Sequence, residues 1–123
     1  MRDTDRYYKK VIESVKLLAL PYEQQKTYFP EFSDIPFEIL DTYDKAFSLL
    51  PSLVEEDRFS NAGIAGLLRL HILIDLTAGI PDLADLGETQ FRDRPEWNKI
   101  RVLAKETLGL IGEPLEKPDP DYI

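Results

Sequence analysis

The sequence predicts an all-α fold, an irregular bundle of four main helices with short helical turns between them. Apolar residues recur at helical spacing in four long segments, and no segment of useful length shows the alternation of a strand. Prolines and glycines stand at the ends of these segments. A chain of 123 residues fits one domain, and we assign residues 1–112 to it. Residues 113–123, acidic and rich in proline, are predicted to form a mobile tail.

The first helix is predicted from Asp3 or Thr4 to about Leu20, where Pro21 ends it. Its apolar residues recur at helical spacing, and charged residues fill the other side. A short helix is expected within residues 22–29.

The second main helix is predicted to begin near Ser33 or Asp34, with Pro36 in its first turn. Pro51 breaks this helix or opens a further turn. One stripe of apolar residues is expected to face the core, and its members are Phe37, Leu40, Tyr43, Phe47 and Leu50.

The third helix has the clearest start signal, because Ser60 is a good N-cap residue. The segment that follows is apolar nearly all round, which is typical of a central, buried helix. We therefore expect the helix at about 60–78 to lie at the centre of the bundle, with Leu67, Leu68 and Ile72 buried.

The last main helix is predicted to begin near Asp93 and to end at Gly112. Trp97 lies on its apolar face and is expected in the core.

The chain has no cysteine, one histidine and a formal net charge of −8. Disulfides and thiolate metal sites are therefore excluded, and no cofactor-binding motif is present. Residues 21–60 carry three basic and nine acidic groups, for a net charge of −6. Such a chain is expected to repel nucleic acid and anionic membranes and to attract a basic protein. The charged N-terminal segment is not typical of a signal peptide, and a cytoplasmic location is expected.

His71 and Asp75 are four residues apart, so they share a helical face and can form a hydrogen bond. A histidine oriented by an aspartate is half of a nucleophilic triad. However, no activated nucleophile accompanies the pair, and we predict no catalytic residue and no enzyme activity. A small helical enzyme or ligand-binding domain with an inter-helix pocket near His71 and Asp75 is the alternative hypothesis.

Carboxylates recur every three or four residues along the second helix, so they are expected on one side of it. A further acidic group follows at a turn. These residues are the predicted partner-binding site: Glu31, Asp34, Glu38, Asp41, Asp44, Glu55, Glu56 and Asp57. The alternatives are a solvated face and a metal site. Di-metal bundles also need Glu-x-x-His pairs, which this sequence lacks.

The run LPYEQQKTYFPEFSDIPFEILDTYDKAF, followed by VEEDRFSNAGIAGLLRLHILID, is both acidic and aromatic. In this it resembles small bacterial immunity proteins of contact-dependent inhibition and polymorphic toxin systems. The resemblance covers roughly residues 17–76. It implies a cytoplasmic single-domain protein that binds and blocks a toxin domain, often a basic nuclease. No fixed motif transfers, so the resemblance assigns no individual functional residue.

Overall fold

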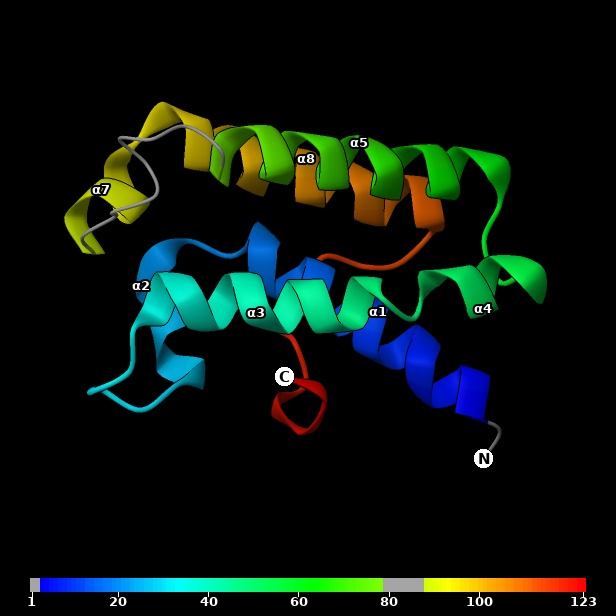
Figure 1. Cartoon of the computed structure of the whole chain (residues 1–123), viewed down its shortest axis with the longest axis horizontal. Coiled ribbons are helices and arrows are strands. Elements are labelled where there is room, and N and C mark those ends of the chain that lie inside the picture. The colour runs from blue at the N-terminus through cyan, green and yellow to red at the C-terminus, as the bar shows by residue number, and fades with distance from the viewer. Residues whose placement is uncertain (1–2, 79–87) are drawn as a thin grey trace.

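The computed structural model describes residues 3–78 and 88–123, and within them the predicted all-α fold is confirmed. The four main helices are α1 (Asp3–Ala19), α3 (Ile35–Phe47), α5 (Asn61–Ala78) and α8 (Pro95–Ile111). The shorter elements are α2 (Tyr22–Gln25), η1 (Lys26–Tyr28), α4 (Leu50–Glu55), α7 (Glu88–Asp93) and η2 (Pro120–Tyr122). Figure 1 shows α5 beside α8 in one layer, with α1 and α3 in the other.

Local signals set several helix ends. The Asp34 carboxylate accepts a hydrogen bond from the Phe37 backbone N–H at 3.3 Å, which caps α3. Ser60 Oγ accepts from the Gly63 N–H at 3.1 Å and caps α5 in the same way. Gly112 ends α8 with a φ of 89°, a left-handed conformation that glycine adopts without strain.

The helix at the centre of the bundle is α1. Every residue from 11 to 20 is buried, and α1 packs against α3, α4, α8 and η2. The expectation that residues 60–78 form the central helix is therefore wrong, although the bounds of α5 agree with it.

The position of α5 explains this difference. Its main helical neighbour in the described part is α8, and Gly66 lies so close to α8 that an added Cβ would stand 3.0 Å from Leu110 Cδ1. The opposite face of α5 is exposed: Leu68, Ile72 and Leu76 are 47%, 57% and 68% exposed. By length and composition α5 is the one described helix that is apolar enough to cross a membrane, a test that core helices of soluble proteins also pass. Uniform hydrophobicity therefore does not tell which face of a helix is covered.

Adjacent leucines of α5 provide a matched test of this placement. Leu67→Ala is expected to lower the free energy of unfolding by about 2–5 kcal/mol, because Leu67 is fully buried. Leu68→Ala is expected to cost less than about 1 kcal/mol, because its side chain is half exposed. Urea denaturation of the two variants measures both values. Similar losses in the two variants would show that the α5 face is covered.

The core stripe of α3 also differs from the predicted one. The buried residues are Ile35, Pro36, Ile39, Tyr43 and Ala46, whereas Phe37 is exposed. Of the other predicted members, Tyr43 and Leu50 are buried, and Leu40 and Phe47 are partly buried against the core. The first three residues of α3, Ile35, Pro36 and Phe37, are all apolar and point in different directions around the helix. Hydrophobicity alone therefore does not indicate that Phe37 is the one that faces outward.

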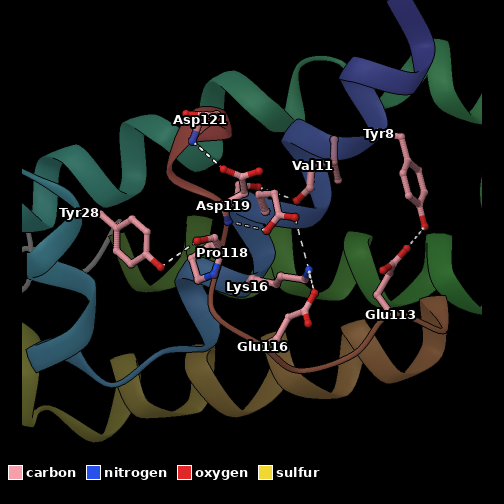
Figure 2. A network of polar contacts seen from close by, with 11 residues as sticks. Tyr8, Val11, Lys16, Tyr28, Glu113, Glu116, Pro118, Asp119 and Asp121 are labelled. Carbon is pink, nitrogen blue, oxygen red and sulfur yellow. Dashed lines mark hydrogen bonds and ion pairs between the residues drawn. The ribbon is translucent and has the colours of Figure 1, made fainter. Parts of the chain in front are cut away.

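Residues 113–123, here called the C-terminal strap, lie across α1 (Figure 2). Beneath the strap, Glu13 and Lys16 form an almost fully buried ion pair at 3.3 Å. Asp119 donates its backbone N–H to Glu13 Oε2 at 3.1 Å, and Lys16 Nζ donates to Glu116 Oε1 at 3.0 Å. The strap therefore supplies both members of this pair with further partners.

Two tyrosines hold the strap at other points. Tyr8 donates its hydroxyl to Glu113 Oε1 at 2.7 Å, and Tyr28 donates to the Pro118 carbonyl at 2.8 Å (Figure 2). Pro118 itself is buried. The composition of residues 113–123 predicts a mobile tail, whereas these contacts are those of a packed segment. The composition of the strap gives no indication that Glu13 and Lys16 are buried on α1 and form hydrogen bonds with it.

The Tyr8 contact predicts a loss of stability at high pH. Burial and the hydrogen bond to Glu113 raise the pKa of Tyr8 above its ordinary value. The unfolded chain therefore loses this proton first, so the stabilisation is present below about pH 10 and is lost as the pH rises further. Tyr8→Phe is expected to lower stability at neutral pH by about 0.5–1.5 kcal/mol and to make the alkaline decline shallower. Urea titrations followed by circular dichroism test this, and equal alkaline slopes in both proteins would contradict it.

Candidate functional site

The eight predicted site residues are here called the acidic surface. Six of them are exposed, and Glu38 and Asp41 are partly exposed. Glu31 and Asp34 precede α3 or cap it, and Glu38, Asp41 and Asp44 lie on α3. The other three, Glu55, Glu56 and Asp57, lie at the end of α4. Figure 1 shows α3 and α4 in succession along the length of the molecule, so the segments that carry these acids, here called the acidic row, follow one another. The structure does not gather them into one pocket.

A cleft of about 670 Å³ lies at the start of this row, between η1 and the beginning of α3. Its lining includes Glu31 and Asp34, together with Phe29, the buried Tyr22 and Lys26. Lys26 brings one positive charge to the two carboxylates, which leaves this cleft with a net negative charge.

A second cleft, of about 410 Å³, lies farther along α3 and includes Glu38 and Asp41. Here the charge is mixed, because Lys10 and Lys45 also line the cleft. Lys45 Nζ lies 2.9 Å from Asp41 Oδ2, and this hydrogen bond raises the pKa of Lys45. The acidic row is therefore partly neutralised at its centre, which the spacing of the acids did not predict.

The carboxylates at Asp44, Glu55 and Asp57 are exposed and form no ion pair with any residue in the described part of the chain. Among residues 3–78 and 88–123, no group of three or more histidine or acidic side chains is arranged to hold a metal ion. The acidic surface thus presents open negative charge along α3 and α4.

Two exposed phenylalanines lie within the acidic row, and neither is among the predicted site residues, since Phe37 is expected in the core. Phe32 is 92% exposed and Phe37 is 60% exposed. Phe32 stands between Glu31 and Asp34, and Phe37 follows in the first turn of α3. For Phe32, the available signal is a large ring in a polar segment between Pro30 and Pro36. Exposed rings flanked by charges are typical anchors of protein interfaces.

His71 is held between α3 and α5 by three side chains. Its Nδ1 lies 3.2 Å from the Tyr43 hydroxyl, and its Nε2 lies 3.3 Å from Asp75 Oδ2. With its proton on Nε2, the ring accepts the Tyr43 hydroxyl at Nδ1 and places the Nε2–H beside the Asp75 carboxylate. Phe47 stacks on the ring at a centroid distance of 4.1 Å. Both ring nitrogens are thus occupied, and the clefts described in this section are lined by other residues.

Positively charged side chains lie together near α8. A cleft of about 240 Å³ is lined by Arg92, Arg101 and Lys105, with Glu23 as its carboxylate. Arg101 is buried, which lowers its pKa, and its guanidinium donates to the carbonyls of Phe91 and Arg92. The charge is therefore uneven over the described part of the molecule, with positive side chains near α8 and negative ones along α3 and α4.

No family model, curated protein or solved structure matches this chain.

Proposed function

We propose that this chain is a small acidic binding protein that inhibits or neutralises a basic protein partner, such as a toxin, through its acidic surface. The observation that carries the proposal is the combination of exposed phenylalanines with open carboxylates along α3. Phe32 and Phe37 supply apolar contact area, and Glu31, Asp34 and Asp44 supply charge. We place this activity in the bacterial cytoplasm, as expected of an immunity-type protein.

The charges and the rings have different roles in this proposal. Carboxylates at the rim of an interface mainly increase the association rate and exclude partners of the wrong charge. Rings that become fully covered contribute most of the binding energy and slow dissociation. Glu31 and Asp34, whose cleft also includes Lys26, are the proposed contacts for an arginine or lysine side chain of the partner. We propose no catalytic residue and no cofactor for this activity.

A capture experiment tests the proposal. The immobilised chain is exposed to lysate of its host, in parallel with the double variant Asp44→Lys, Glu55→Lys. We expect the wild type to retain a basic protein that the double variant retains weakly or loses. The proposal is contradicted if both chains retain the same proteins, or if the retained partner is acidic.

The two exposed rings give a second prediction. Phe32→Ser and Phe37→Ser are each expected to weaken binding of the captured partner by about 2 kcal/mol, mainly through faster dissociation. Stability of the free chain should change by less than about 0.5 kcal/mol, because both rings are exposed. Leu115→Ser, at an exposed apolar residue of the strap, is the matched control. Surface plasmon resonance gives the rates, and equal dissociation rates for the Phe variants and the control would exclude the rings from the interface.

A further inference from the structure

The cleft of about 240 Å³ beside α8 lies between the end of α1, α2, α7 and α8. Two of the positive side chains that line it, Arg101 and Lys105, are four residues apart on α8 and share one face of that helix. Arg92 of α7 also lines the cleft. Positive charge is therefore concentrated in one small opening of a chain whose formal net charge is −8.

The carboxylates beside this cleft, Glu23 and Asp93, are both engaged by Arg92. Arg92 Nε donates to Asp93 Oδ1 at 2.8 Å, and Arg92 Nη1 lies 3.7 Å from Glu23 Oε1. Asp93 also acts on Arg101 through its charge, but neither Arg101 nor Lys105 forms an ion pair with a residue of the described part. Two cations of the cleft therefore remain available to an anion.

Arg101 is the fixed group of the cleft. It is only 7% exposed, and its guanidinium donates to the carbonyls of Phe91 and Arg92 at 3.1 and 3.4 Å. Its buried Nε–H has no acceptor among the described residues. Burial of a charged group without a paired counter-charge is costly, so an anion in the cleft would stabilise this guanidinium.

From this arrangement we infer that the cleft binds a phosphate group, with Arg101 and Lys105 as its main contacts and Arg92 at its rim. A guanidinium matches the oxygen geometry of phosphate, and an ammonium adds a compact charge. A phosphate monoester carries nearly two negative charges at neutral pH, more than a carboxylate does.

The size of the cleft limits what else the ligand can carry. Pockets for drug-sized ligands measure about 300–1,000 Å³, and this cleft is smaller. It therefore suits a phosphate group with a small organic part, which Ala19, Pro21 and Val102 would contact. The cleft is formed by α1, α2, α7 and α8, whereas the acidic surface lies along α3 and α4, so the phosphate site is a property beyond the proposed function.

A titration of the isotope-labelled chain with sodium phosphate at constant ionic strength tests the site. The Nε–H resonance of Arg101, followed by nuclear magnetic resonance, reports directly on the buried guanidinium. We expect a saturable shift with a dissociation constant of about 1–10 mM, because the net charge of the chain opposes an anion. Sodium chloride at the same ionic strength should not produce this shift.

Two charge reversals on α8 separate a local site from an effect of overall charge. Lys105→Glu should raise the dissociation constant for phosphate at least about tenfold, because it replaces a proposed contact by a like charge. Lys99→Glu should change it less than about twofold, because Lys99 is exposed on α8 and is not among the residues that line the cleft. The two variants have the same net charge, and circular dichroism verifies that both are folded.

A soluble phosphate monoester and a lipid head group present the same chemistry, and two probes distinguish them. Glycerol phosphate tests the soluble source. Phosphatidylcholine vesicles that contain phosphatidic acid test the lipid source. Binding of either probe that Lys105→Glu weakens and Lys99→Glu does not would support the site and identify its source.

Three outcomes would overturn the inference. The first is the absence of a saturable shift of the Arg101 resonance up to about 50 mM phosphate, well above the expected dissociation constant. The second is equal weakening by Lys105→Glu and Lys99→Glu, which would show a response to overall charge alone. The third is equal binding of vesicles with phosphatidylglycerol and with phosphatidic acid, which would show a general attraction to anionic surfaces.

Discussion

Glu13→Ala is expected to lower the free energy of unfolding by about 3–5 kcal/mol, the range for breaking a buried ion pair by removal of one partner. Glu13 is almost fully buried, pairs with Lys16 and accepts the backbone N–H of Asp119. Its loss leaves a buried ammonium with only Glu116 as a counter-ion and frees one point of the strap. Urea denaturation followed by circular dichroism gives the value.

Two further variants test whether the loss of stability comes from breaking a buried ion pair. Asp41→Ala breaks the exposed pair with Lys45 and should cost less than about 1 kcal/mol. Replacing both buried charges, as Glu13→Leu with Lys16→Met, should cost less than Glu13→Ala alone, because no uncompensated charge remains. A loss below about 1 kcal/mol for Glu13→Ala would mean that the strap does not seal this pair from water.

Local chemistry accounts for the parts of the fold that the sequence predicted. Asp34, Ser60 and Gly112 act within a few residues, and each has the predicted place at a helix end. Burial was harder to predict, because it depends on contacts distant in sequence. Residues Glu13 and Lys16 make α1 look amphipathic and peripheral, yet the strap and neighbouring helices enclose it. The more apolar α5 keeps one face exposed.

The candidate site divides in the same way. Helical spacing predicted that Glu38, Asp41 and Asp44 avoid the core, because it depends only on the periodicity of α3. The pairing of Lys45 with Asp41 and the exposure of Phe32 depend on side-chain positions and on the loop before α3. Periodicity carries no information about either.

The double variant Asp44→Lys, Glu55→Lys is expected to slow association with a basic partner at least tenfold at low salt. Asp44 and Glu55 are exposed and form no ion pair in the described part of the chain, so stability should change by less than about 1 kcal/mol. A control with the same net charge is Asn98→Lys, Glu106→Lys, Gly109→Lys on α8, at three exposed positions. Both variants move the net charge from −8 to −4.

The most direct test of the acidic surface as a binding site is the association rate of the captured partner as a function of ionic strength. For the wild type we predict a rate that falls steeply as salt rises. For Asp44→Lys, Glu55→Lys we predict a lower rate and a flatter salt dependence, and for the α8 control a rate close to that of the wild type. Equal rates and equal salt slopes for all three proteins would contradict a role of the acidic surface in binding.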